Sequence, residues 1–143
     1  MKHANLLETD AQIAELLKET KTIAVLGIKT EAQSFQPAFT VPRYMQSAGF
    51  RIIPVPVYYP EATEILGEKV YRKVADIPVP VDLVNIFRRS EDIPPHVADI
   101  LAAKPKAVWF QSGIRNDEAA RTFAEHGIKV VQNLCLMVEH RYL

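Results

Sequence analysis

The side chains with the clearest chemical potential in this sequence are cationic and hydroxyl groups that follow short apolar runs. Charge-assisted hydrogen bonds from lysine or arginine to phosphate oxygens are among the strongest in proteins, and a nearby glycine lets backbone amides approach the same ligand. Such residues follow three of the five apolar runs: Lys29 and Thr30, Arg88 and Arg89, and Ser112 and Gly113. Their types and positions predict a site for an anionic ligand.

The two arginines have an alternative role. Glu91 and Asp92 follow them closely, so these side chains could pair with one another on a solvated loop. Neither arginine would then be available to a ligand, because both charges would be satisfied within the loop. The sequence alone leaves both roles open.

Signatures of the common nucleotide-binding loops are missing. Gly27 is the only glycine in residues 25–45, whereas the dinucleotide fingerprint needs three glycines and an acid about 20 residues later. After the second apolar run the first acidic residue is Glu61, and no G-x-x-x-x-G-K-[ST] loop occurs. These absences argue against NAD as the ligand and against ATP or GTP hydrolysis.

Catalytic motifs are equally hard to find. The chain has no G-x-S-x-G elbow and no H-E-x-x-H zinc motif, and His96 and His126 are expected at opposite ends of helices. The remaining candidate is the terminal "CLMVEH", in which Cys135 and Glu139 share a helix face while His140 lies about 140° from Cys135. We therefore predict a binding protein without catalytic or metal-binding residues, and a structural role for this segment as a buried cysteine and a docked terminal helix.

The elements that must position these residues alternate along the chain. Apolar runs at 22–27, 51–57, 82–87, 107–110 and 128–131 are separated by segments with a 3.6-residue apolar period. Nearly continuous apolar strands between amphipathic helices are typical of a parallel sheet covered on both faces. The prediction is one doubly wound α/β domain, Rossmann-like, with a five-stranded mainly parallel sheet whose carboxyl ends hold the ligand.

Capping signals predict where the helices begin and end. Thr9 and Gln12 have capping-box spacing before the first strand, Thr40 is a candidate N-cap with Pro42 in the first turn, and Asn116 is another N-cap. Helix stops are expected at Gly49 and Gly127. A terminal helix is expected after Asn133, with three apolar side chains facing the core: Leu134, Met137 and Val138. Residues 58–80 lack a helical stripe, so we expect irregular structure with a short helix or an edge strand near 69–71.

Composition excludes several classes of function. The 143 residues fit one domain, and 17 basic against 17 acidic side chains give no net field that would attract nucleic acid. The single Cys135 excludes an internal disulfide and suits a reducing compartment. No run approaches the roughly 20 apolar residues of a membrane span, and no secretory segment is evident, so we expect a cytoplasmic protein.

Several segments together resemble a known family. "TIAVLGIK", "VPRYMQSAGFRIIPV", "ILGEKVYRKVADIPVPVDLVNIFRRSEDIP", "AVWFQSGIRNDEAA" and "CLMVEH" are similar, in order, to the stand-alone CoA-binding domain family and to the N-terminal CoA-binding domain of the succinyl-CoA synthetase alpha subunit. They span residues 22–140. The resemblance implies a Rossmann-like CoA-binding domain over residues 1–143, with residues 1–20 as an N-terminal helix packed on it.

The resemblance also implies a ligand and its contacts. The ligand would be CoA or an acyl-CoA, lying across the strand ends, and the residues expected to contact it are Gly27, Ile28, Lys29, Thr30, Thr40, Val41, Arg43, Pro54, Val55, Phe87, Arg88, Arg89, Ile93, Gln111, Ser112 and Gly113. Two alternatives stay open, a CoA-dependent transferase or thiol-dependent enzyme using Cys135, and a ligand-free protein-interaction domain. Protein partners are not indicated.

Overall fold

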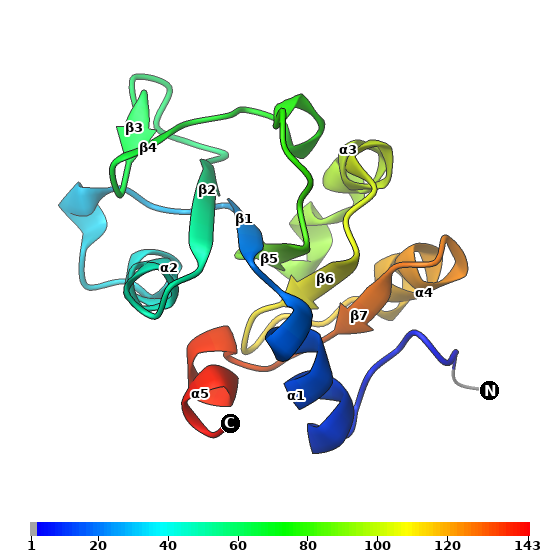
Figure 1. The fold of residues 1–143 in the computed structure, drawn as a ribbon. Coiled ribbons are helices and arrows are strands. Elements are labelled where there is room, and N and C mark those ends of the chain that lie inside the picture. The colour runs from blue at the N-terminus through cyan, green and yellow to red at the C-terminus, as the bar shows by residue number, and fades with distance from the viewer. Residues whose placement is uncertain (1–2) are drawn as a thin grey trace.

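Five parallel strands form the central sheet of the computed structural model, which describes residues 3–143 (Figure 1). Their order is β2-β1-β5-β6-β7, and their bounds are β1 (Thr22–Leu26), β2 (Arg51–Val55), β5 (Leu83–Ile86), β6 (Ala107–Phe110) and β7 (Lys129–Val131). Leu26 lies opposite both Val55 and Ile86, so the three neighbouring strands end level with one another. The predicted doubly wound α/β sheet is confirmed, with all of its strands parallel.

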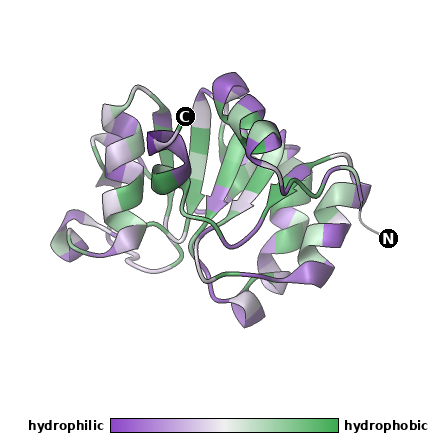
Figure 2. Cartoon of the chain, turned by 90° about the horizontal axis from the view of Figure 1, so that it is seen from below, coloured by the Kyte–Doolittle hydropathy of each residue, from purple (hydrophilic) through white to green (hydrophobic). Residues whose placement is uncertain are grey.

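Helices cover both faces of this sheet, each through an apolar stripe. One face packs against α1 (Asp10–Glu19), α2 (Pro37–Ser47) and α5 (Leu136–Arg141), and the other against α3 (Val97–Ala103) and α4 (Asp117–Glu125). Figure 2 shows hydrophobic residues concentrated along the strands and hydrophilic ones on the outward sides of the helices. Among residues 3–143, none of the helices combines the length and apolar character that crossing a membrane requires.

Two of the predicted helix starts are confirmed. Thr9 and Gln12 form the capping box of α1, and Asn116 Oδ1 accepts the Ala119 N–H at 3.0 Å at the start of α4. Gly49 and Gly127 both have positive φ angles after α2 and α4, as expected for helix stops.

The predicted start of α2 is wrong by four residues. The helix begins at Pro37, with Gln36 as N-cap, so Thr40 and Pro42 lie inside it. Pro37 is the stronger start signal because proline at the first helical position has its φ angle already set and loses no hydrogen bond. Pro42 stands where proline normally costs a helix about 3 kcal/mol or more.

The last helix and the region after β2 also differ in detail from the prediction. In α5 it is Leu136 that is buried, while Val138 is exposed, because the helix begins only at Leu136. Residues 58–80 contain a two-stranded hairpin of β3 (Glu64–Ile65) and β4 (Glu68–Lys69) and a short 3-10 turn at Val74–Asp76. The expectation of an edge strand near residue 69 is therefore confirmed.

Both edges of the main sheet are covered. Outside β2, the Tyr71 N–H donates to the Pro54 carbonyl oxygen at 3.0 Å. Outside β7, the N-terminal segment runs alongside the strand, with the Leu7 N–H donating to the Val130 oxygen at 2.8 Å and the Val130 N–H to the Asn5 oxygen at 2.7 Å. Pro54 is tolerated because an edge strand does not need a hydrogen bond from every N–H.

Candidate functional site

The candidate site lies at the carboxyl ends of β1 and β5, where the order of the strands reverses. The chain leaves β1 toward β2 on one side and leaves β5 toward β6 on the other. Such a switch point is where open parallel sheets hold their ligands. A groove of about 520 Å³ opens there, lined by Lys29, Gln36, Pro37, Ala38, Phe87, Arg88, Arg89, Ser90, Glu91, Gly113 and Ile114.

Gly27 lets the two central loops approach each other beneath this groove. Its φ angle is 88°, and a Cβ atom at this position would collide with the carbonyl oxygen of Phe87. The Gly27 N–H donates to the Val55 oxygen, and the Phe87 N–H donates to the Leu26 oxygen, both at 2.9 Å. The single glycine of this loop is thus required by contact between protein backbones rather than by a pyrophosphate.

The loop from β1 to α2 is held by hydrogen bonds at both ends. Thr30 caps a short 3-10 helix at Glu31–Gln33, and its hydroxyl donates to Gln33 Oε1 at 2.8 Å. Glu31 Oε2 accepts the Leu66 N–H at 2.9 Å, which ties the loop to the β3–β4 turn. The Thr30 hydroxyl is therefore engaged within the loop, and Lys29 is the residue of this loop that lines the groove.

The N-terminus of α2 opens into the same groove. Pro37 and Ala38, its first two residues, line the wall, and the Gln36 side chain makes no capping hydrogen bond. Pro37 has no N–H and the Phe39 N–H donates to the Gln36 oxygen at 2.8 Å, so the Ala38 N–H is the amide of this first turn that has no partner among the described residues. The helix dipole places partial positive charge at the same end. This end of α2 is therefore suited to an anion.

Arg88 and Arg89 have opposite roles. Arg89 is exposed, and its Nε lies 2.9 Å from Asp92 Oδ2 and 3.5 Å from Glu91 Oε1. The Nε of Arg88 is buried and has no hydrogen-bond partner in the part of the chain that the structure describes. The pairing alternative holds for Arg89, whereas Arg88 lines the groove and forms no ion pair with a described residue.

His96 is affected by the charge of Arg88. Burial, and next the Arg88 guanidinium, lower the pKa of His96, while Asp99 and Asp92 act in the opposite direction. Among the described residues, no carboxylate lies within ion-pair distance of Arg88. An anionic group bound beside it would supply the missing partner.

The opposite wall of the groove is the loop after β6. The Gly113 N–H donates to Asn133 Oδ1 at 2.7 Å, so the segment after β7 holds this loop in place. Gln111 points away from the groove: it is 4% exposed, and its Oε1 accepts hydrogen bonds from Asn85 Nδ2 and the Leu136 N–H, each at 3.3 Å. Ser112 is exposed but does not line the groove.

Some of the residues predicted from the sequence line the groove, and others do not. The structure brings together Lys29, Phe87, Arg88, Arg89 and Gly113 in the lining, and Gly27 contacts the Phe87 backbone, whereas Thr30 does not line the groove. Buried apolar side chains among the predicted contacts belong to the two cores instead: Ile28, Val41, Val55 and Ile93. Thr40, Arg43 and Pro54 also lie outside the lining, Arg43 over the ring of Phe39 at 5.6 Å.

Six lining residues were missed by the sequence analysis: Gln36, Pro37, Ala38, Ser90, Glu91 and Ile114. The first three were missed because the start of α2 was predicted too late in the chain. Pro37 was the available signal, because proline is favoured as the first residue of a helix. With the start placed there, the helix terminus and the groove would have been assigned together.

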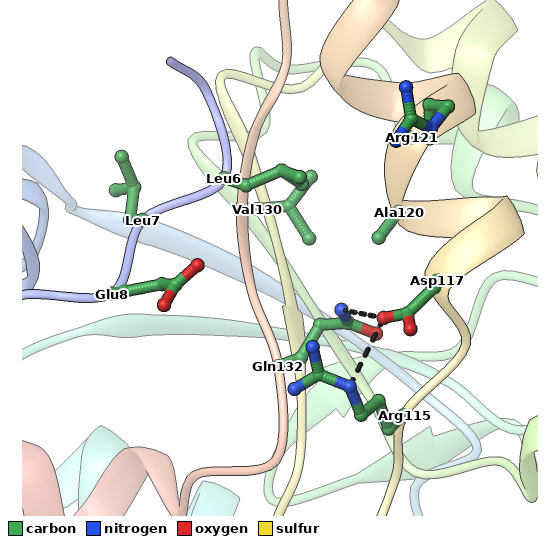
Figure 3. Close-up of a pocket in the computed structure, with 9 residues that line it drawn as sticks. All are labelled: Leu6, Leu7, Glu8, Arg115, Asp117, Ala120, Arg121, Val130 and Gln132. Atoms are coloured by element: carbon green, nitrogen blue, oxygen red, sulfur yellow. Dashed lines mark hydrogen bonds and ion pairs between the residues drawn. The ribbon is translucent and has the colours of Figure 1, made fainter. Parts of the chain in front are cut away.

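A second hollow, of about 360 Å³, lies between α4, β7 and the N-terminal segment (Figure 3). Three of its polar side chains bind one another, since Asp117 Oδ1 lies 3.1 Å from Arg115 Nε and accepts a hydrogen bond from Gln132 Nε2 at 3.0 Å, whereas the exposed Arg121 has no partner among the described residues. The groove at β1 and β5 differs because it lies at the switch point of the sheet, beside the N-terminus of α2. It is the better candidate for an anionic ligand.

The terminal segment has no arrangement typical of a nucleophile. Cys135 is half-buried and is the N-cap that precedes α5. The sequence predicted a buried cysteine within the helix, and the structure differs on both points. His140 Nδ1 lies 2.9 Å from the Tyr44 hydroxyl, and the ring packs edge-on against Phe50. His140 therefore docks α5 onto α2.

Comparison with known proteins identifies the family. The model of the CoA-binding domain matches residues 21–141. Uncharacterized protein YneT of Bacillus subtilis (strain 168) is 37% identical over 130 residues, which are 91% of this chain and 93% of that protein. The similarity thus extends over nearly the whole of both chains.

Solved structures agree with this assignment. A Thermus thermophilus protein, cell-free ID.343, is 38% identical with a TM-score of 0.86, covering 94% of this chain and 98% of its own. A hypothetical protein from Pyrococcus horikoshii OT3 is 31% identical with a TM-score of 0.84, covering 100% and 96%. Acetyl-coenzyme A synthetase 1 from Ca. Korarchaeum cryptofilum, in complex with phosphate and ADP, is 25% identical with a TM-score of 0.68, covering 81% of this chain and 26% of the enzyme. The chain belongs to the CoA-binding domain family.

Proposed function

We propose that this protein binds CoA or an acyl-CoA in the groove at the carboxyl ends of β1 and β5, without catalytic residues of its own. Phosphate groups would lie between Lys29, Arg88 and the N-terminus of α2. The observation that carries the proposal is the half-buried side chain of Arg88, which lines the groove beside the N-terminus of α2 and forms no ion pair with a described residue. A phosphate oxygen is the partner that the charge of a guanidinium favours.

Alanine substitutions of the two adjacent arginines, one at a time, test this proposal. Arg88→Ala should weaken CoA binding by about 10- to 100-fold, because a hydrogen bond to a charged group contributes about 1.5–3 kcal/mol. Arg89→Ala removes the same charge from the next position, where Asp92 and Glu91 already satisfy it, and should change affinity by less than about threefold. Isothermal titration calorimetry measures both. Equal losses in the two variants would contradict the assignment of Arg88.

Ligand preference gives a second test. At a CoA concentration of about 100 times Kd, binding should add about 2.7 kcal/mol and raise the melting temperature by roughly 5–11 °C. NAD should give a smaller rise because it lacks the 3′-phosphate, and dephospho-CoA should too. Arg88→Ala should reduce the difference between the rises in melting temperature that CoA and dephospho-CoA cause. A rise with NAD but none with millimolar CoA would show that the family likeness extends to the fold alone.

Gly113 should matter more to binding than to folding. Its φ angle is 85°, and no other atom lies within 4 Å of an added Cβ, so Gly113→Val meets backbone strain of about 1–2 kcal/mol but no protein clash. The valine side chain would stand at the wall of the groove, where we expect it to reduce CoA affinity at least about tenfold. Titration of CoA alongside urea unfolding separates the two effects. An unchanged affinity would place this loop away from the ligand.

A further inference from the structure

Pro42 occupies a position in α2 where proline is unfavourable. It is preceded by five helical residues, beginning at Pro37. A proline there lacks the N–H that would donate to the carbonyl four residues earlier, and its ring pushes against that carbonyl. In α2 the carbonyl concerned belongs to Ala38.

The Ala38 carbonyl has found a different partner. It accepts the backbone N–H of Lys29 at 3.1 Å, from the loop that follows β1. Ile28, the residue before, is 1% exposed and anchored in the core. The backbone of Lys29 is therefore fixed between the sheet and the first turn of α2, and its side chain lines the groove beside Arg88.

These contacts connect the unfavourable proline to the candidate site. Any other residue at position 42 would bring an N–H that competes with Lys29 for the Ala38 oxygen, because interior helical amides donate to the carbonyl four residues back. Local rules of helix formation are most often broken where function requires it. We propose that Pro42 is a positioning residue: it keeps the Ala38 carbonyl available to Lys29 and thereby fixes the lysine for the phosphate groups of the ligand. This inference rests on the proposed CoA site.

Two variants at position 42 separate the missing N–H from the packing of the ring. Pro42→Ala restores the N–H and loses the ring, whereas replacing Pro42 by lactic acid, which introduces a backbone ester, loses the ring but supplies no N–H. Hydrogen exchange of the Lys29 amide should be about 3- to 10-fold faster in Pro42→Ala, as expected when one ordinary hydrogen bond is weakened. CoA affinity should fall by about the same factor. The lactic acid variant should keep the slow hydrogen exchange of the Lys29 amide and the wild-type affinity for CoA.

Ser47→Ala is the control, because it places a residue that favours the helix at the opposite end of α2. It should change neither the hydrogen exchange of the Lys29 amide nor the affinity for CoA. Unchanged Lys29 exchange in Pro42→Ala, or equal effects of the alanine and lactic acid variants, would overturn the role of Pro42. If the wild-type protein bound no CoA, the proposed function would fail, but Lys29 exchange would still decide the role of Pro42.

Discussion

Gly27→Val should both destabilise the protein and abolish ligand binding. The positive φ angle costs a branched residue about 1–2 kcal/mol, and forcing a side chain into a packed site costs about 1–3 kcal/mol more. Neither loop can easily retreat, because hydrogen bonds hold Gly27 to β2 and Phe87 to β1. We therefore expect a total loss of roughly 2–5 kcal/mol in urea unfolding and no measurable CoA binding.

Gly127→Val is the matched control for this prediction. Gly127 has a similar φ angle of 82°, but no atom of the described structure lies within 4 Å of an added Cβ. Its substitution should cause the backbone strain alone, about 1–2 kcal/mol, and leave CoA affinity unchanged. If both variants lost the same stability, contact with the Phe87 carbonyl could not be the reason that Gly27 is required.

Trp109→Ala should be the most damaging change in the core. Trp109 lies on β6 with no exposed surface, and its Nε1–H donates to the Leu134 carbonyl oxygen at 2.8 Å. Truncating a buried aromatic side chain of this size typically costs about 3–5 kcal/mol, because the cavity cannot fully collapse. This is a large share of the stability of a domain, so Trp109→Ala should be largely unfolded at moderate urea concentrations.

Circular dichroism is the appropriate measurement, because Trp109 is the only tryptophan and its fluorescence is lost with it. Trp109→Phe provides the comparison: it keeps most of the apolar volume but leaves the Leu134 carbonyl without its donor, at a cost of about 1–3 kcal/mol. Equal losses for alanine and phenylalanine would show that the hydrogen bond, which both variants lack, rather than packing makes this side chain important.

The strands and the sheet could be predicted from the sequence because each strand is a short apolar run between helical stripes. The start of α2 could not, since Thr40 and Pro42 form a credible local start signal and Pro37 forms another. The contact that distinguishes them joins Lys29 to Ala38 and depends on the folded loop. The folded loop thus supports the start at Pro37, where proline is favoured as the first residue of a helix.

The sequence predicts a site at the carboxyl edge of the sheet, but it could not show which side chains line the groove there. Proximity to strand ends suggested Val55 and Ile93 as contacts, but both pack into the core. Arg88 and Arg89 are identical in type and adjacent, and the sequence shows only that carboxylates follow them. Which arginine lacks a partner depends on the direction of each side chain, and this is set by the turn after β5.

The two covered sheet edges restrict how copies of this protein can associate. Exposed strand edges with free N–H and carbonyl groups are the usual starting points for joining sheets and for aggregation. Here Tyr71 occupies the outer side of β2, the N-terminal segment occupies that of β7, and Pro54 contributes no N–H at all. Neither edge of the main sheet therefore presents a full row of free N–H and carbonyl groups, and we expect copies of this protein to associate through helices, loops or the β3–β4 hairpin rather than by extending the main sheet.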